Sequence, residues 1–489
     1  MEFNNQAVWV GVEDLTNDKA FVEKAQQEFP TPIHEAIQSE NNDFVSNRRD
    51  FLKYLGFGVG AATVAASCEI PIKRAIPYVV KPDSIVPGVA NYYASSYVQG
   101  SDYASILVKT RDGRPIKIEG NSLSKVTLGG TSARAQAAVL SLYDTNRIQN
   151  PGSIKEGQVV KSTWQQLDAT IKSKLASSSQ IIIVSHTVMS PMTQAAIVAF
   201  KTKYPNTKVV QYDPVSSHAI LEANQQNFGM RNIPSYKFDQ ADVIVSFNAD
   251  FLGTWVSPIE FAAQYAKNRK VDVDNPKMSR HIQVESQMSL TGSNADNRIL
   301  VKPSEQGAAI AALYNAVASA LGVTTIGGPQ VNAKAAKALS KVAGELVAAK
   351  GKSLVVSGSN NTSEQILVNG INSMLGNYNS TIDFSEAFLT RQGNDSDVNN
   401  ALSEISGSTA VLILNANPAF ELSKGAEFAA AIKKAGLSIS FNQTVDETTS
   451  VCQFSAPANH FLESWGDANP KRGHYSLVQP TIAPLFDTV

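Results

Sequence analysis

The chain is 489 residues long, 43% of its residues are hydrophobic and 17% are charged, and its formal net charge is −1. This is the composition of an ordinary folded protein, with room for roughly two to four domains. Basic residues are not in excess, so nothing in the composition indicates a nucleic acid partner. No run of about 18 apolar residues occurs, so no ordinary membrane-spanning helix is predicted.

The cysteine count limits the chemistry of the chain. Only Cys68 and Cys452 are present, whereas a four-iron cluster generally needs four thiolate ligands. The six histidines show no H-x-x-x-H spacing that would suggest a metal site. We expect Cys452 to be a small buried hydrophobic residue, and a disulfide with Cys68 stays open.

Residues 1–68 are predicted to be an export-signal region. Arg48 and Arg49, followed by a weakly apolar stretch at 51–67, match the twin-arginine export pattern. Cys68 comes directly after small residues, as at a lipoprotein cleavage site, and acylation there is expected to anchor the chain. The alternative is an unmodified thiol. The signal places the protein on the periplasmic side of the bacterial inner membrane, associated with that membrane.

Residues 69–160 are expected to form a proline-rich extended arm followed by a β-hairpin domain. Prolines recur through the arm and oppose regular helix. Apolar residues then alternate on both sides of Asp112-Gly113, which predicts a hairpin with a type I′ turn. A Gly-rich loop at 129–132 leads into a predicted helix at 135–143.

From residue 161 onward, short apolar runs alternate with helical segments. This pattern predicts an α/β fold with doubly wound, mainly parallel sheets in more than one lobe. A first α/β domain is expected at 161–322 and a second at 323–489. The predicted strands are 180–185, 208–212, 242–247 and 281–285 in the first domain and 353–357, 410–415 and 437–441 in the second. The predicted helices are 192–204, 259–267 and 308–321, with a peripheral linker and helix at 323–341.

Several stretches resemble the molybdopterin oxidoreductase family. They are DGRPIKIEGN and GGTSARAQAAVLSLYD, then Arg147 and Pro151, and later FNADFLGTW, QVESQMSLTGSNADNRILVKP and NANPAF. In that family the last cysteine of an N-terminal iron–sulfur site lies in the Gly-rich loop, where this chain has Ser132. The resemblance therefore implies that the fold is kept and that this cluster is absent.

A narrower resemblance is to the large iron–sulfur and molybdopterin-like subunit of bacterial alternative complex III, a membrane-bound quinol oxidoreductase. It rests on RRDFLKYLGFG, IPYVVKPDSIVPG, NYYAS and ESWGDANPKRGHYSLVQPTIAPLFDT, in that order. The resemblance implies a quinol-oxidising membrane subunit, haem c subunits and a terminal oxidase as partners. It also implies Fe–S clusters in a domain beyond residue 489, so we expect the sequence to be truncated.

The candidate cleft residues are Ser217, Asp250, Glu285 and Asp296. Ser217 lies in the loop where the family places its protein ligand to molybdenum, but a loop serine is usually a turn or cap residue. The three carboxylates are expected on the cleft side of the sheet, either for acid–base work or, as the plainer interpretation, for capping and loop bracing. Glu305 stands where the family binds phosphate, which is unfavourable for an anion.

Two hypotheses follow from these observations. The first is a cofactorless, molybdopterin-enzyme-like structural subunit of a quinol:cytochrome c (or oxidase) electron-transfer complex. It would have no catalytic residue, no metal ligand and no molybdopterin of its own. The alternative is a catalytically active molybdopterin-dependent oxidoreductase that uses Ser217, or no protein ligand, at its metal.

Overall fold

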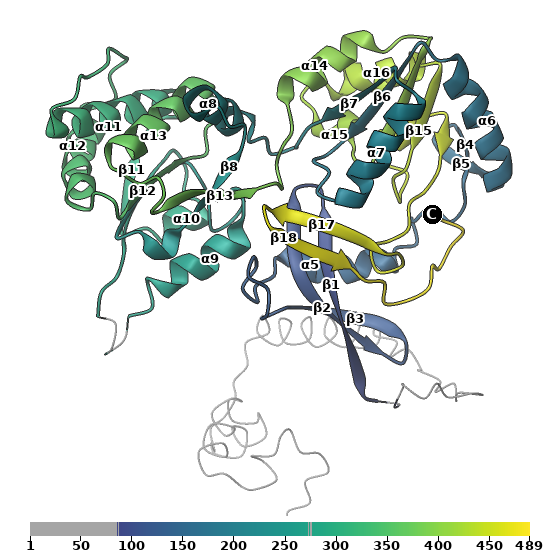
Figure 1. Ribbon diagram of the computed structural model, residues 1–489, viewed down its shortest axis with the longest axis horizontal. Coiled ribbons are helices and arrows are strands. Elements are labelled where there is room, and N and C mark those ends of the chain that lie inside the picture. The colour runs from purple at the N-terminus through teal and green to yellow at the C-terminus, as the bar shows by residue number, and fades with distance from the viewer. Residues whose placement is uncertain (1–85, 87, 272, 274–275) are drawn as a thin grey trace, which may run out of the picture. The chain divides into compact units, whose positions relative to one another are not determined.

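The computed structural model describes residues 86, 88–271, 273 and 276–489 (Figure 1). The predicted export signal at Arg48 and Arg49, the predicted lipid-attachment residue Cys68 and residues 69–85 and 87 of the predicted arm lie outside the described residues. All described residues belong to one compact unit, Pro82–Val489. Within the described part of the chain, no helix combines the length and the apolar character needed to cross a membrane.

The first element is a three-stranded antiparallel sheet in the order β1-β2-β3. Its strands are β1 (Ala90–Gln99), β2 (Asp102–Arg111) and β3 (Arg114–Gly120). Asp112 and Gly113 both have positive φ, 50° and 75°, as a type I′ turn requires. The predicted hairpin is thus confirmed, and the end of the predicted arm is a strand that pairs with β2 along its whole length.

Gly113 provides a clean test of this turn. Gly113→Ala is expected to lower the free energy of unfolding by roughly 1–2 kcal/mol, because its φ of 75° strains an L-residue although nothing lies within 4 Å of the added Cβ. Gly344→Ala, in open space inside a helix, should instead stabilise by roughly 0.5–1 kcal/mol. Denaturant unfolding of both variants measures the difference, and equal shifts would contradict the assigned turn.

A seven-stranded sheet has the order β5-β4-β16-β15-β14-β6-β7. The strands β14, β15, β16, β6 and β7 run parallel, and the hairpin β4–β5 adds an antiparallel edge. The bounds are β4 (Gly152–Lys155), β5 (Gln158–Lys161), β6 (Gln180–Ser185), β7 (Thr207–Gln211), β14 (Thr409–Leu414), β15 (Leu437–Ser440) and β16 (Phe454–Ser455).

A second, four-stranded parallel sheet has the order β11-β10-β9-β12. Its strands are β9 (Val243–Phe247), β10 (Arg280–Glu285), β11 (Asn297–Leu300) and β12 (Ser353–Ser357). Val245 packs into one core and Ile244 into another, so both faces of the sheet are buried. This explains why β9 and β12 are mainly apolar runs.

The predicted domain boundaries at 160/161 and 322/323 do not separate these sheets. β6, from the predicted first domain, pairs in parallel with β14 from the second, and β9 likewise pairs with β12. The β4–β5 hairpin, assigned to the N-terminal domain, extends the seven-stranded sheet. The boundaries were inaccurate because local hydrophobic patterns identify strands but carry no information on which distant strand will pair with them.

A third sheet of four antiparallel strands, β18-β17-β13-β8, was not predicted. Its strands are β8 (Ile233–Tyr236), β13 (Ile382–Phe388), β17 (Gly466–Lys471) and β18 (His474–Val478). Lys471 in β17 forms a buried ion pair with Glu260, with Nζ and Oε1 2.9 Å apart. The C-terminal hairpin β17–β18 is therefore attached to the core around the four-stranded parallel sheet.

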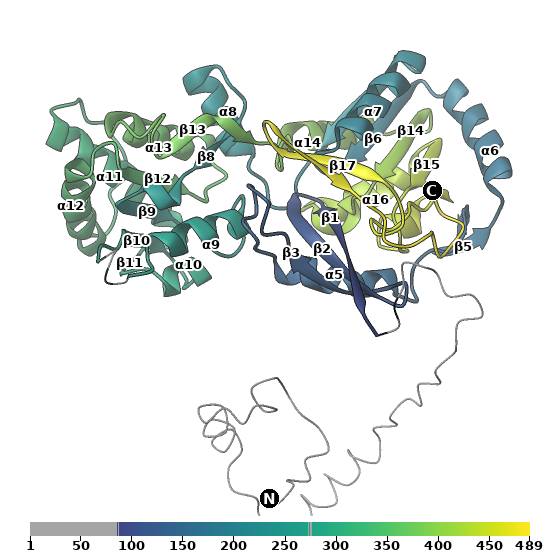
Figure 2. The same ribbon diagram turned by 60° about the horizontal axis from the view of Figure 1, so that its bottom comes forward.

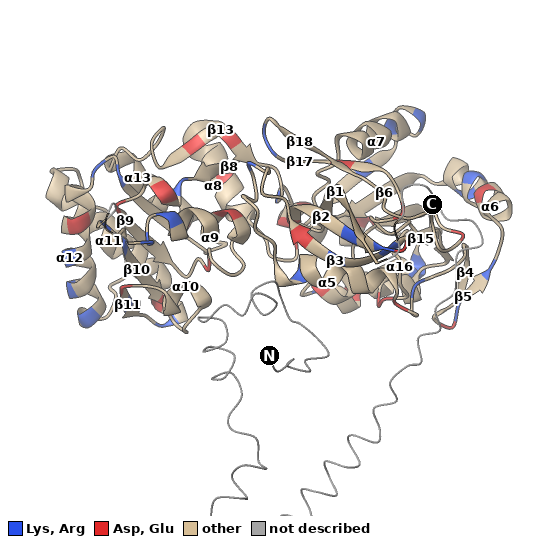
Figure 3. Cartoon of the chain, turned by 90° about the horizontal axis from the view of Figure 1, so that it is seen from below, with Lys and Arg blue, Asp and Glu red and all other residues tan. Residues whose placement is uncertain are grey.

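Helices cover both faces of each parallel sheet (Figures 1 and 2). The seven-stranded sheet has α6 (Trp164–Ser177) and α7 (Pro191–Lys203) on one face and α14 (Asp395–Glu404) and α16 (Gly425–Lys434) on the other. The other helices are α5 (Ala133–Leu142), α8 (His218–Phe228), α9 (Pro258–Lys267), α10 (Leu290–Ser293), α11 (Gln306–Leu321), α12 (Ala333–Ala348), α13 (Thr362–Met374) and α15 (Pro418–Glu421). Acidic and basic residues are interspersed along the elements seen in Figure 3.

Candidate functional site

In the seven-stranded sheet, the direction in which the chain adds successive strands reverses between β6 and β14. From β6 the chain proceeds outward to β7, whereas from β14 it proceeds the other way to β15 and β16. In doubly wound sheets, the crevice outside the carboxyl ends of the strands at such a switch point is where ligands bind. The residues that follow β6, β7 and β14 are therefore the candidates for a functional site.

Three side chains bridge this switch point. His186 follows β6, Tyr212 follows β7 and Glu421 ends α15, just after β14. The Nε2 atom of His186 lies 2.8 Å from Oε2 of Glu421, and the Tyr212 hydroxyl donates to the same oxygen. Tyr212 is only 1% exposed and its ring meets the His186 ring edge-on. The crevice between β6 and β14 is thus spanned by the chain's own polar side chains.

The turn between β1 and β2 also reaches this edge. Ser101 in that turn donates from Oγ to Oδ1 of Asp213 over 2.9 Å. The buried Asp213 carboxylate also accepts from Thr187 Oγ1 and from the backbone N–H of Gly393, each at 2.9 Å. A Cβ on Gly100 would lie 3.2 Å from Nδ1 of His186. The N-terminal sheet therefore covers the carboxyl edge of the seven-stranded sheet.

The space left at this edge does not fit a pterin dinucleotide. A cavity of about 190 Å³ lies beside Tyr212 and Asp213, below the roughly 300–1,000 Å³ of ordinary ligand pockets. Its lining includes the carboxylates of Asp213 and Asp395 and one lysine, Lys424. The two carboxylates oppose the binding of phosphate groups in this cavity.

The second parallel sheet is closed in a similar way between β9 and β12. A Cβ on Gly358 would lie 2.4 Å from the carbonyl oxygen of Asn248, so the two strand ends pack directly on each other. Asp250 accepts from the backbone N–H and hydroxyl of Thr291, at 2.9 and 2.7 Å. This backbone contact leaves no room for a ligand between these two strand ends.

Glu285 is the last residue of β10 and, like Asp250, contacts the start of α10. Glu285 is 1% exposed, accepts from Arg298 Nε at 2.7 Å and from Ser289 Oγ at 2.7 Å, and is packed against Gly292. Ser289 is the N-cap of α10, and Thr291, the partner of Asp250, lies in its first turn. Both carboxylates therefore brace this short helix.

Asp296 does not lie where the sequence predicted. It precedes β11, accepts from the backbone N–H of His281 at the start of β10, and pairs with both terminal nitrogens of Arg269 at 2.6 and 2.9 Å. Burial alone would raise the pKa of the Asp296 carboxyl, but these hydrogen bonds outweigh burial and lower it. Asp296 is thus a brace at the amino end of β10, the end opposite Glu285.

Ser217 belongs to the loop after β7, on the seven-stranded sheet, and is separate from the three carboxylates in the contacts described. It is 7% exposed and precedes α8, but its hydroxyl forms no capping hydrogen bond, and its carbonyl accepts from Ile220 and Leu221. The predicted candidates therefore do not form one site.

Ser132, at the position of the family's cluster cysteine, is the N-cap of α5, and its Oγ accepts from the backbone N–H of Ala135 at 3.1 Å. Glu305 stabilises the start of α11 by accepting hydrogen bonds from Lys302 N and Asn332 Nδ2.

Burial raises the pKa of the Cys452 thiol to about 12, so the side chain stays neutral and packs as a hydrophobic residue. Among the described residues, no group of three or more metal-binding side chains occurs.

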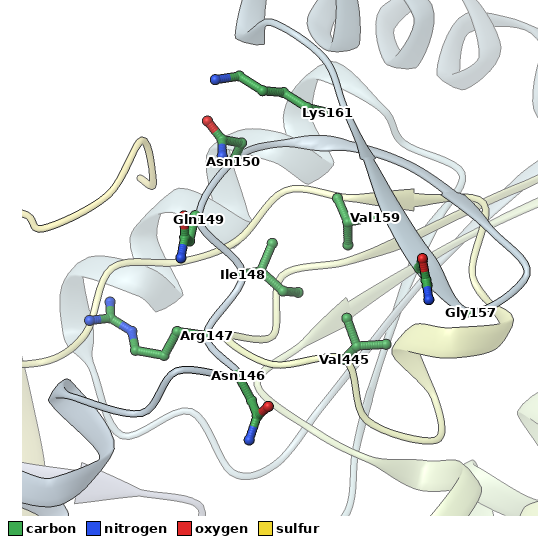
Figure 4. A pocket seen from close by; sticks show the side chains of 10 residues that line it. Asn146, Arg147, Ile148, Gln149, Asn150, Gly157, Val159, Lys161 and Val445 are labelled. Atoms are coloured by element: carbon green, nitrogen blue, oxygen red, sulfur yellow. The ribbon is translucent and has the colours of Figure 1, made fainter.

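A larger cavity of about 490 Å³ lies elsewhere, between the 146–150 loop, the β4–β5 hairpin and Val445. In Figure 4 the guanidinium of Arg147 points away from Val159 and Val445. That guanidinium is paired with Glu463, and the other charged side chain along the cavity is Lys161. None of the residues that line this cavity belongs to the His186–Tyr212–Glu421 bridge or to the ends of β9 and β12.

Sequence reasoning missed His186, Tyr212, Asp213 and Glu421. A usable signal was present, because His186 directly follows the predicted strand 180–185, Tyr212 ends the predicted strand 208–212 and Asp213 follows it. Glu421 comes directly after the recognised segment NANPAF. Polar residues at the carboxyl ends of adjacent parallel strands meet at one edge of a sheet.

The bridge at the switch point can be tested with Glu421→Ala. The variant should lose roughly 2–3 kcal/mol of stability, because the buried donors on His186 and Tyr212 lose their acceptor. Burial would raise the pKa of Glu421, but the hydrogen bond from His186 and other contacts outweigh it and lower the pKa. The contribution is therefore present above the unfolded pKa and is lost as pH falls through the lower folded value.

Urea unfolding at pH 7 and pH 4 measures this contribution. Glu427→Ala, at an exposed position on α16, is the matched control and should change stability by less than about 0.5 kcal/mol. Equal effects of the two substitutions would contradict the bridge.

The doubly wound parallel sheets and the sheets around them form a molybdopterin-oxidoreductase-like fold. The fold is similar to that of acetylene hydratase from Pelobacter acetylenicus, with a TM-score of 0.60 and 11% sequence identity over 81% of this chain and 67% of that chain. No protein-family model matches the sequence.

Among curated proteins, the chain is similar to the menaquinone reductase, molybdopterin-binding-like subunit, of Nitratidesulfovibrio vulgaris. The two sequences are 22% identical over 499 residues, which cover 90% of this chain and 70% of the relative. The chain is thus similar in sequence to a menaquinone reductase subunit and in fold to acetylene hydratase.

Proposed function

We propose that the chain is a cofactorless, molybdopterin-enzyme-like structural subunit of a membrane-bound complex that oxidises quinol. The relative from Nitratidesulfovibrio vulgaris supports the quinone-linked and molybdopterin-like parts of this proposal, because it is named as a molybdopterin-binding-like subunit of a menaquinone reductase. The direction, quinol oxidation, rests on the sequence resemblance. Within this class, the order of sequence motifs favours a complex of the alternative complex III type.

The observation that carries the cofactorless role is the bridged switch point. His186, Tyr212 and Glu421 occupy the crevice at which a doubly wound sheet binds its ligand, and the β1–β2 turn covers the same edge through Ser101. A dinucleotide would have to break these contacts and displace buried side chains. The fold would then serve as a scaffold that holds redox-active neighbours in position.

The proposed setting follows from the sequence resemblance. The partners would be a quinol-oxidising membrane subunit, haem c subunits and a terminal oxidase, with Fe–S clusters in a part of the protein beyond residue 489. Export through Arg48 and Arg49 and acylation of Cys68 would place the chain on the periplasmic side of the inner membrane. In this proposal, the partner subunits determine which quinol is oxidised and which acceptor is reduced.

One observation favours the alternative, a catalytic molybdopterin-dependent oxidoreductase. Nδ1 of His218, Oγ1 of Thr390 and Nε of Arg391 are buried and have no hydrogen-bond partner among the described residues. His218 follows the Ser217 loop, and Arg391 contacts that loop by donating to the carbonyl of Val215 at 2.8 Å. Polar groups of this kind are suited to a ligand, which the alternative would place there.

The two functions are distinguished in the native host with the full-length gene carrying an affinity tag. We expect the tagged protein to co-purify with a quinol-oxidising membrane subunit and haem c proteins, and Ser217→Ala to leave the quinol oxidation rate of the assembled complex within about twofold. Ser216→Ala, next to the candidate ligand, is the matched control. A selective loss of activity in Ser217→Ala, or purification without respiratory partners, would overturn the proposal.

A further inference from the structure

One face of the N-terminal sheet carries a cluster of cationic side chains. Tyr92, Lys109 and Lys117 lie directly across from one another on β1, β2 and β3. Arg111 and Arg114 are paired one step further along, two residues from Lys109 on β2. Because alternate residues of a strand share a face, these side chains project from the same side of the sheet. The other side is buried against α5.

Within the part of the chain that the structure describes, carboxylates compensate these cations only in part. Lys117 lies 3.2 Å from Glu119, but no carboxylate among the described residues comes within 4 Å of Lys109, Arg111 or Arg114. The side chains of Arg111 and Arg114 are exposed. In a chain with a net charge of −1, this face is a local concentration of positive charge. Such a face attracts an anionic surface.

Apolar groups stand among the cations. Tyr92 is 50% exposed, and Lys109 Nζ lies 5.7 Å from the centre of its ring. Ile116 is 49% exposed, and the register shift between Lys109 and Thr110 leaves it without a partner on β2. A tyrosine and a bulged isoleucine between cations are the side chains that enter the boundary between lipid headgroups and acyl chains.

The location of this face fits a membrane contact. The first residue of β1, Ala90, is paired with Arg111, so the chain enters the sheet at the end that bears the cations. The same end of the sheet, purple in Figures 1 and 2, extends away from the two parallel sheets. Nothing in the described chain packs over Arg111, Arg114 or Ile116 sufficiently to bury them.

We propose that this basic hairpin face, made up of Tyr92, Lys109, Arg111, Arg114, Ile116 and Lys117, docks on the surface of a bilayer that contains anionic phospholipids. The combination of fixed cations with exposed aromatic and aliphatic groups favours lipid over an acidic protein surface. The inference is independent of whether the fold holds a cofactor. Docking would fix the orientation of the subunit relative to the membrane.

Vesicle binding by the full-length protein tests the proposal. Cys68→Ser is used throughout, so that an acyl chain cannot contribute. The protein should sediment with vesicles of phosphatidylcholine and phosphatidylglycerol but not with phosphatidylcholine alone, and binding should weaken between about 50 and about 300 mM salt. Arg111→Ala/Arg114→Ala should lower the partition coefficient at least about tenfold, since each cation near an anionic surface contributes about fivefold.

The matched control is Lys433→Ala/Lys434→Ala, which removes two exposed cations from α16. It should change the partition coefficient by less than about twofold, and thermal unfolding should be the same for both variants within about 2 °C. The proposal is overturned by equal binding to neutral and anionic vesicles, by no binding to either, or by equal losses in the two variants. Binding to a purified acidic partner protein without vesicle binding also overturns it.

Discussion

Arg147→Ala is expected to lower the free energy of unfolding by about 3–5 kcal/mol, which would be the largest effect of any single substitution considered for this chain. Arg147 is paired with Glu463 through two hydrogen bonds, of 3.0 and 2.6 Å. The exposed fractions of the two side chains are 2% and 0%. Truncation of Arg147 leaves a buried carboxylate without its charge partner, which costs far more than the loss of a surface ion pair.

The pair also connects distant parts of the sequence. Arg147 follows α5, and Glu463 lies in the C-terminal segment, three residues before β17. The backbone N–H groups of His460 and Leu485 donate to Glu463, and the Arg147 guanidinium lies 5.0 Å from the centre of the Phe486 ring. Loss of the pair should therefore loosen the C-terminal segment as well as the helix end.

The pH dependence of this pair has a definite sign. Burial alone would raise the pKa of Glu463, but the hydrogen bonds from Arg147, His460 and Leu485 outweigh burial and lower it. A lowered folded pKa gives stability that is present above the unfolded value, about 4.3, and is lost as pH falls through the folded value.

Chemical unfolding at pH 7 measures the effect. The control is Lys172→Ala, which removes an exposed i,i+4 partner of Asp168 and should cost less than about 0.5 kcal/mol. A loss below about 1 kcal/mol for Arg147→Ala would contradict the buried pair.

The second large effect is a loss of stability between pH 6.5 and pH 5. Burial lowers the pKa of both His281 and His460 to about 4. Over this range the unfolded chain binds protons on both residues and the folded chain does not, so stability falls as the pH falls. Each histidine should contribute a loss of roughly 2 kcal/mol, at about 1.4 kcal/mol per pH unit.

The contacts of each histidine explain why protonation is resisted. His281 is fully buried, with Tyr265 Oη 3.0 Å from its Nδ1. His460 is 2% exposed, its Nε2 lies 2.9 Å from Ser141 Oγ, and the charge of Arg147 also opposes a proton on its ring. Unfolding curves measured at half-unit pH intervals give the slope of the free energy of unfolding against pH. The double variant His281→Gln/His460→Gln should have a smaller slope than the unchanged protein. If the double variant keeps the same slope, the loss of stability between pH 6.5 and pH 5 comes from titratable groups other than these two histidines, which would contradict the prediction.

Much of the fold could be predicted from the sequence, because its strands are short apolar runs with clear ends. QIIIVS, DVIVSF and SLVVS are strands with bounds within a residue of those expected, and Asp112-Gly113 forms the expected turn. The pairing of β6 with β14 and of β9 with β12 could not be predicted, since strands far apart in sequence are brought together by tertiary packing. The third sheet was missed because β8 is very short and β17 contains Pro470.

The candidate site was predicted less well. Asp250 and Glu285 do lie at the carboxyl edge of their sheet, but their carboxylates hold α10. Asp296, which lies within the family-like segment 283–303, was also assigned to that edge, yet it precedes β11 and so lies at the amino end. The residues that close the switch point come from α15, from loops after two strands and from the β1–β2 turn. Their meeting depends on sheet order, which a single sequence does not contain.

The most direct test of the central claim, that the switch point is closed by protein side chains in place of a pterin, is metal and pterin analysis of the complete protein purified from its native host. Molybdenum and tungsten are measured by mass spectrometry, and pterin is measured by fluorescence after oxidative release. The account predicts molybdenum, tungsten and pterin far below one per chain. Stoichiometric molybdenum or tungsten together with a pterin would contradict it.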